Sequence, residues 1–286
     1  MNQQVGELFD LFSEGRIDRR EFLSRLVLIA GGTAAAAAGL PARVGAASSI
    51  QFVAADDKRL HVEDISYPAP SGEMKGHLAR PADEAKFPGV VVIHENRGLN
   101  PHTKDVARRF ALEGYQALAP DALSPLGGTP EDVDEARGLM QKLDRSETTK
   151  NFAAAVAYLK THPLSTGKVA CVGFCWGGAV TNQVAVHSPD LDAAVPFYGS
   201  QPAAEDVPRI QASLLLHYAG DDERINAGIP AFEEALKKAG IDYRIFMYEG
   251  AQHAFFNDAN RARYNEEAAR LAWERTLDFF KEKLKA

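Results

Sequence analysis

The sequence predicts an α/β fold, with a single domain, a mostly parallel central sheet and helices on both faces of that sheet. Strand and helix signals alternate from about residue 60 to the C-terminus, which is typical of this architecture. Residues 89–94 (GVVVIH) form a short unbroken apolar run, as expected for a strand buried on both faces. No linker, internal repeat or low-complexity segment divides residues 50–286, so we expect one domain there.

The expected elements follow from these signals in chain order. Two strands, 62–67 and 74–79, are joined by a Pro-Ala-Pro-Ser-Gly turn. The helix expected at 148–160 carries apolar residues on one stripe, and so does the final helix at 261–284. Further strands are expected at 89–94, 115–119, 168–173, 193–197, 213–217 and 243–248, and further helices at 103–113, 176–187 and 230–239.

The N-terminal segment differs from the rest of the chain. Arg19 and Arg20 are followed by Glu-Phe-Leu, a moderately apolar run, five alanines and a patch of small residues. This order is a signal-peptide pattern, and the twin arginine resembles a Tat signal, which exports folded proteins. We therefore predict a Tat-like signal at 1–47 and the mature domain at 48–286. Cleavage is expected after Ala46 or Ala47.

Export implies contact with the Tat machinery and a periplasmic or secreted location. The alternatives are an uncleaved membrane anchor and an amphipathic starting helix. A permanent span needs about 20 strongly apolar residues, and this Gly/Ala-rich run is too weakly hydrophobic for that role. We expect no stable membrane anchor after cleavage.

Composition excludes several classes of function. The net charge is −7, from 32 basic and 39 acidic residues, and no Lys/Arg-rich run provides the charge pattern of a nucleic-acid binder. The two cysteines, Cys171 and Cys175, cannot form a disulfide framework and are too few for a zinc site. There is no H-E-x-x-H, P-loop or G-x-G-x-x-G motif, so we expect neither a metal nor an organic cofactor.

The most informative motif is Gly173-Phe-Cys175-Trp176-Gly177, between an expected strand and an expected helix. It matches the nucleophile elbow of α/β-hydrolases, with cysteine where serine usually stands. The turn places Cys175 at a helix N-terminus, where the dipole and free N–H groups favour a thiolate. The N–H of Trp176 is then one oxyanion donor. The alternative is a tight turn with a buried thiol; Cys171, inside the strand, is expected to be a core residue.

Partners for this nucleophile occur in the expected chain order of nucleophile, acid and histidine. An acidic loop with Asp221 and Asp222 follows the strand at 213–217, and we favour Asp222 as the residue that orients the imidazole. His253 follows the strand at 243–248 and is the candidate base. Taken singly, an acidic loop and a loop histidine are more often ordinary surface features.

Together these residues resemble the dienelactone hydrolase family, whose type enzyme is carboxymethylenebutenolidase. The resemblance covers about residues 60–284 and rests on His94-Glu95, Gly-Phe-Cys-Trp-Gly-Gly, the Gly220–Asp222 loop and Gly250–Phe255. It implies that Glu95 contacts the nucleophile and controls its ionisation until substrate binds. A carboxylate near a thiol also opposes thiolate formation on physical grounds. The N–H of Asn96 matches the second oxyanion donor of the family.

Two positions depart from the family pattern. The type enzyme binds its substrate's carboxylate with two arginines, but here Asn257 stands four residues after His253, and Arg137 does not align cleanly with the other arginine. Arg97, beside Glu95, is another source of positive charge. We therefore name Arg97, Arg137 and Phe255 as substrate-binding candidates, and the resemblance does not transfer dienelactone as the substrate.

The predicted activity is hydrolysis of an ester or lactone through a Cys-His-Asp triad and a thioester acyl-enzyme. One alternative is a carboxylesterase or thioesterase of broad specificity. The other is an exported binding or thiol-sensing protein without catalysis, because a cysteine elbow is open to oxidation. The joint presence of Glu95, Cys175, Asp222 and His253 argues against a binding protein. The physiological substrate and the oligomeric state do not follow from the sequence.

Overall fold

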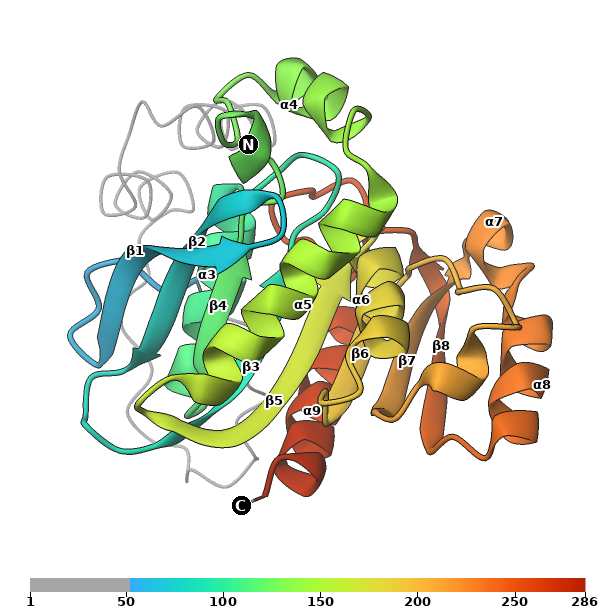
Figure 1. Ribbon diagram of the computed structural model, residues 1–286. Helices are drawn as coiled ribbons and strands as arrows, with labels where there is room; N and C mark the ends of the chain where they lie inside the picture. The colour runs from blue at the N-terminus through green and yellow to red at the C-terminus, as the bar shows by residue number, and fades with distance from the viewer. Residues whose placement is uncertain (1–51, 286) are drawn as a thin grey trace, which may run out of the picture. The chain divides into compact units, whose positions relative to one another are not determined.

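The computed structural model describes residues 52–285, and the predicted signal segment at 1–47 lies outside them. Eight strands form one sheet in the order β1-β2-β4-β3-β5-β6-β7-β8 (Figure 1). Strands β1, β2 and β4 pair antiparallel, and all pairs from β4 through β3 to β8 are parallel. Within the described part of the chain, no helix is long and apolar enough to cross a membrane.

The strands and helices have the following bounds. The strands are β1 Leu60–Ala69, β2 Gly72–Pro81, β3 Phe87–Ile93, β4 Gln116–Pro120, β5 Ser165–Phe174, β6 Ala193–Phe197, β7 Ser213–Asp221 and β8 Tyr243–Gln252. The helices are α3 Pro101–Leu112, α4 Val133–Met140, α5 Arg145–Thr161, α6 Trp176–His187, α7 Glu223–Asn226, α8 Ile229–Ala239 and α9 Glu266–Lys283.

Helices cover the sheet on both faces. The helices α5, α6 and α8 pack on one face, and α3 and α9 pack on the other (Figure 1). Alternation along the strands explains this arrangement, because Val91 and Ile93 of β3 face the first layer while Val90 and Val92 face the second. Strands that are apolar at consecutive positions therefore supply two cores, as the run at 89–94 predicts.

All the expected strands and helices are present. The short helices α4 and α7 are additional, several strands extend beyond their predicted bounds, and α9 begins later than predicted. The short helix α4 lies in the segment 131–143, which was not assigned to a helix; it begins where Asp132 accepts hydrogen bonds from two backbone N–H groups. Helix α9 begins at Glu266 rather than 261, because Asn265 accepts a hydrogen bond from the N–H of Ala268 and so caps the first turn. Cys171 is a fully buried core residue, as predicted.

Candidate active site

Cys175 lies on a strained turn between β5 and α6. Its φ of 57° and ψ of −112° are rare for a residue with a side chain, and this strain is typical of a functional turn. The flanking glycines are required by close packing: a Cβ on Gly173 would lie 2.2 Å from the carbonyl oxygen of Gly177. A Cβ on Gly177 would lie 2.4 Å from the carbonyl oxygen of His94. The backbone thus holds the thiol at the carboxyl edge of the sheet.

The surroundings of Cys175 favour the protonated thiol. Burial raises its pKa to about 11, and the negative charge of Glu95 acts in the same direction. The N–H of Trp176 and the charge of Arg224 favour the thiolate, but their effect is smaller. The stabilisation expected from the helix N-terminus is therefore present and is outweighed by burial. Arg224 was not singled out in the sequence.

His253 is held by the acidic residue favoured in the sequence. Its Nδ1 donates to Oδ2 of Asp222 at 2.5 Å, and Asp222 is buried. Asp222 also accepts a hydrogen bond from the N–H of Ile225 as the N-cap of α7, which fixes the carboxylate. Asp221, its neighbour, is the last residue of β7 and is exposed. Because Nδ1 carries the proton, Nε2 of His253 is left as the basic nitrogen.

Glu95 is buried and held by two residues that sequence reasoning did not assign to it. The Nδ2 of Asn257 donates to Oε2 of Glu95 at 2.9 Å, and the hydroxyl of Tyr198 donates to Oε1 at 3.5 Å. Tyr198 has a φ of 38° and packs its ring on the imidazole of His253, with centroids 5.0 Å apart. Asn257 is the position where the sequence departs from the type enzyme. The departure from the family pattern at Asn257 therefore places a hydrogen-bond donor on Glu95.

His94 fixes the turn that carries Asn96. Its Nδ1 donates to the carbonyl of Glu95 at 2.6 Å, and its Nε2 accepts from the N–H of Ala122 at 3.1 Å. Burial lowers the pKa of His94, which keeps this imidazole neutral. The ring stacks on the indole of Trp176, with centroids 5.4 Å apart. The two candidate oxyanion donors, on Asn96 and Trp176, are thereby tied to one rigid unit.

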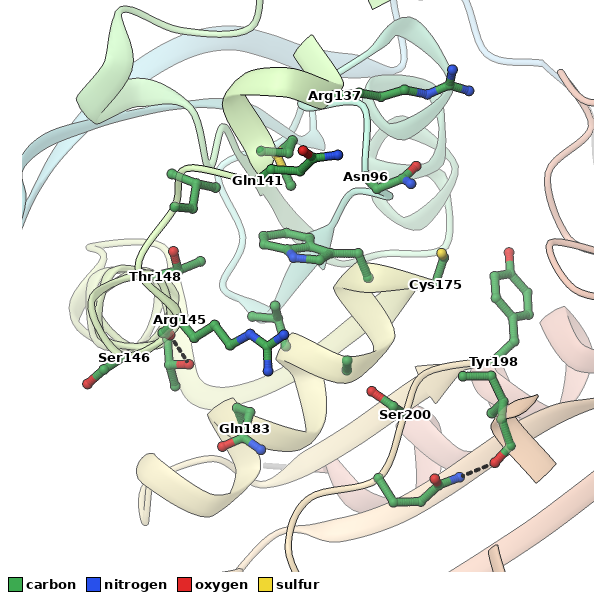
Figure 2. A pocket seen from close by; sticks show the side chains of 18 of the residues that line it. Asn96, Arg137, Gln141, Arg145, Ser146, Thr148, Cys175, Gln183, Tyr198 and Ser200 are labelled. Carbon is green, nitrogen blue, oxygen red and sulfur yellow. Dashed lines mark hydrogen bonds between the residues drawn. The ribbon is translucent and has the colours of Figure 1, made fainter. Parts of the chain in front are cut away.

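One cavity of about 890 Å³ joins these groups. Cys175, His253, Asn96, Trp176 and Tyr198 line one part of it, which we call the thiol end. Figure 2 shows Cys175 and Tyr198 on one side of the view, and Arg145, Ser146 and Thr148 of α5 on the other. A pocket of this size, with a few polar groups converging on a nucleophile, is typical of a small-molecule site.

Of the three predicted substrate-binding residues, only Arg137 lines the cavity, where it also pairs with Asp134 at 3.0 Å. Phe255 and Arg97 are placed differently. Phe255 is fully buried and packs its ring against Tyr198 and Tyr248, so it supports the site from behind instead of contacting substrate. Arg97 is half-buried and is not among the residues that line the cavity.

Further polar residues line the cavity and were not found from the sequence. Arg145 and Lys150 lie on the first turns of α5, and Gln183 lies on α6. Their side chains reach the site from elements whose relative placement depends on helix packing. A lone charged residue on a helix surface carries no sequence signal for such a role.

Known proteins resemble this chain in sequence and in fold. Residues 74–284 match the Dienelactone hydrolase family. Relatives from Synechocystis sp. and Saccharolobus solfataricus, each named "Putative carboxymethylenebutenolidase", are 33% identical over 239 and 255 residues. Each match covers 77% of this chain, and 96% and 98% of the respective relatives.

A crystal structure described as a dienelactone hydrolase-like promiscuous phosphotriesterase from metagenomic libraries has the same fold. It superposes with a TM-score of 0.72 at 27% identity, covering 79% of this chain and all of that one. A mostly parallel eight-stranded sheet of this kind is the α/β-hydrolase fold, so the fold predicted from the sequence is confirmed.

Proposed function

Since this chain belongs to the dienelactone hydrolase family and is a hydrolase of that type, we propose that it cleaves an ester or lactone through a thioester on Cys175. The observation that carries the proposal is the position of Cys175 on a strained elbow, in one cavity with His253, whose imidazole is oriented by Asp222. A nucleophile, a base and a residue that orients the base are the parts that acyl transfer requires.

The proposed reaction begins from the protonated thiol. As Sγ of Cys175 attacks the ester carbonyl, Nε2 of His253 takes the thiol proton, and the new C–S bond places a negative charge on the former carbonyl oxygen. The N–H groups of Trp176 and Asn96 stabilise that charge. When the tetrahedral intermediate collapses, the C–O bond to the leaving group breaks, and His253 protonates the leaving alkoxide.

Hydrolysis of the thioester completes the cycle. Water attacks the acyl carbon while His253 removes its proton, and the C–S bond breaks as the tetrahedral intermediate collapses. The sulfur leaves as a thiolate and regains the proton from His253, which restores the resting thiol. The carboxylate of Asp222 stabilises the imidazolium that forms twice in each cycle.

A broad carboxylesterase or thioesterase activity is the second candidate. The neutral Asn257 binds Glu95, where the type enzyme uses an arginine for a substrate carboxylate, and the cavity of about 890 Å³ exceeds the needs of a small lactone. Both features favour acceptance of ester substrates other than a dienelactone.

The decisive experiment compares wild-type protein with Cys175→Ala and Cys171→Ala, under reducing conditions, on 4-nitrophenyl acetate and on dienelactone. We expect Cys175→Ala to lose about 10⁴-fold or more in kcat, as removal of a nucleophile does. Cys171→Ala, a change in the buried strand, should keep the activity. Mass spectrometry should find the acyl group on Cys175 during turnover. Equal rates for wild type and Cys175→Ala would exclude the proposal, and inactivity on both substrates would favour a binding or thiol-sensing role.

We also propose that residues 1–47 direct export to the periplasm through the Tat machinery. The support is the twin arginine at Arg19-Arg20, followed by a moderately apolar run and small residues. Expression of the full chain followed by fractionation and N-terminal sequencing tests this. We expect a mature form that begins close to Ala47, and retention of the precursor with Arg19→Lys/Arg20→Lys. A full-length chain in the cytoplasm would contradict the proposal.

A further inference from the structure

The cavity extends far beyond the thiol end. Five residues of α6 line it, and four of them follow Trp176 at intervals of three, four, seven and eleven residues, which places all five on a single face of the helix. They are Trp176, Ala179, Val180, Gln183 and His187. At a rise of about 1.5 Å per residue, this face runs for roughly 16 Å from Trp176 to His187. A small lactone bound at Cys175 would leave most of this length empty.

The charges that line the cavity are of one sign. The permanently charged side chains are Arg137, Arg145, Lys150 and Arg224, and the described lining residues include no Asp or Glu. The chain as a whole has a net charge of −7, so this basic lining is a local feature. A cavity lined by one sign of charge concentrates ligands of the opposite sign.

Two of these four cations are already neutralised by neighbouring carboxylates. Arg137 pairs with Asp134 at 3.0 Å, and Lys150 pairs with Glu147 at 2.8 Å. In the described part of the chain, Arg145 and Arg224 have no such ion pair. Arg224 lies close enough to Cys175 to lower the pKa of its thiol, and so belongs to the thiol end.

Arg145 stands at the other end of the cavity, which we call the far end. It is the first residue of α5, and Figure 2 shows its side chain extending from α5 into the cavity beside Gln183 of α6, on the opposite side of the view from Cys175. The carboxylates nearest to it in the chain are occupied: Asp144 accepts from the N–H of Glu147, and Glu147 binds Lys150. Its guanidinium is therefore available to an anion in the cavity.

We propose that the cavity binds an extended ester whose far end carries a carboxylate or similar anionic group, and that Arg145 binds that group. This rests on the proposed hydrolase function and specifies its substrate class. Gln183 lies seven residues beyond Trp176, or roughly 10 Å along α6, which an extended chain of about eight bonds spans. Arg145 presents a planar guanidinium with several N–H donors to the anion, and the side-chain amide of Gln183 supplies a further donor beside it.

Synthetic half-esters test the proposal directly. The substrates are 4-nitrophenyl hydrogen suberate, its neutral methyl ester, and the shorter 4-nitrophenyl hydrogen adipate, with release of 4-nitrophenolate as the readout. We expect the wild-type protein to have a KM for the suberate half-ester roughly tenfold or more below that for the neutral methyl ester. The adipate half-ester should gain less from its charge, because its carboxylate stops short of Arg145.

Substitution of Arg145 separates binding of the anion from the chemistry. Arg145→Gln should raise the KM for the suberate half-ester roughly 10- to 100-fold, with little change in kcat, and should leave the methyl ester unaffected. Arg145→Lys keeps the charge and should restore part of the loss. The matched control is Arg209→Gln, which removes one positive charge outside the cavity and should change neither KM.

Direct binding distinguishes the failure of this inference from the failure of the proposed function. Calorimetry with the suberate dianion on Cys175→Ala should detect binding that is lost in Cys175→Ala/Arg145→Gln. Such binding without any Cys175-dependent turnover would keep the anion site and reject the hydrolase mechanism. Turnover that depends on Cys175 but responds equally to charged and neutral substrates, or is unchanged by Arg145→Gln, would overturn the anion site alone.

Discussion

Behind the thiol end of the cavity, two carboxylates are held in the protein interior, whereas Arg145 at the far end stands on exposed helix surface. Glu95 and Asp222 are buried, and each makes hydrogen bonds to other parts of the fold. Arg145 is an exposed residue of α5. Groups that perform chemistry need fixed geometry, while groups that select a substrate can change without disturbing the core. The comparison separates changes that affect kcat or folding from changes that affect KM.

After the loss of Cys175 itself, the largest effect expected at the thiol end comes from the residue that orients His253. Asp222→Asn should lower kcat by about 10³- to 10⁴-fold, because an amide at this position favours the wrong tautomer of the imidazole. Asp221→Asn is the matched control, since Asp221 is adjacent in the chain and exposed. Steady-state kinetics on 4-nitrophenyl acetate measures both variants. Similar losses in the two would show that Asp222 has no special role.

Two glycine substitutions compare the close packing of the elbow with the open surroundings of the helix α4. Gly177→Ala places a Cβ within 2.9 Å of three backbone atoms of Ile93 and His94, and should lower the free energy of unfolding by about 3 kcal/mol or more. Gly138→Ala, in the helix α4, meets no atom within 4 Å and should raise the free energy of unfolding by about 0.5–1 kcal/mol. Urea denaturation measures both. A tolerated Gly177→Ala would contradict the rigid elbow.

The hydrogen bonds to Glu95 should differ in strength. Asn257→Ala removes the donor 2.9 Å from Oε2 and the acceptor for the N–H of Ala259, and should destabilise the fold by about 1–3 kcal/mol. Tyr198→Phe removes a contact of 3.5 Å, which is long for an O–H donor, and should cost less than about 1 kcal/mol. The order of the two denaturation midpoints is the test, and the reverse order would assign the support of Glu95 to Tyr198.

The smallest effect concerns the ionisation of the thiol. In the resting protein the pKa of Cys175 is raised to about 11 by burial and then by Glu95, so alkylation by iodoacetamide should quicken up to that pH. Glu95→Gln removes a negative charge that disfavours the thiolate, so the pKa falls and the inflection moves to lower pH. At pH 8 the rate should rise roughly three- to tenfold. The exposed Glu249→Gln is the control, and an unmoved inflection in Glu95→Gln would remove Glu95 from control of the thiol.

Much of the fold and the order of the site residues could be predicted from local sequence. The apolar run at 89–94 predicts a buried strand, and the glycines around Cys175 predict a tight turn between a strand and a helix. Both predictions depend only on the local sequence. The choice of Asp222 over Asp221 agrees with the hydrogen bond to His253. Phe255 could not be placed this way, because an aromatic residue beside His253 can point to the cavity or the core, and burial decides between them.

The sequence alone thus determined the fold class, the elbow and the residues available for catalysis, because strand periodicity and tight turns are local properties. Only the tertiary structure decided which distant groups meet. Asn257 lies 162 residues from Glu95 along the chain and still donates to it. Arg145 and Gln183 line the same cavity as Cys175 because α5 and α6 pack side by side on one face of the sheet. Such contacts depend on the order of the strands and the packing of the helices, and no local pattern encodes either.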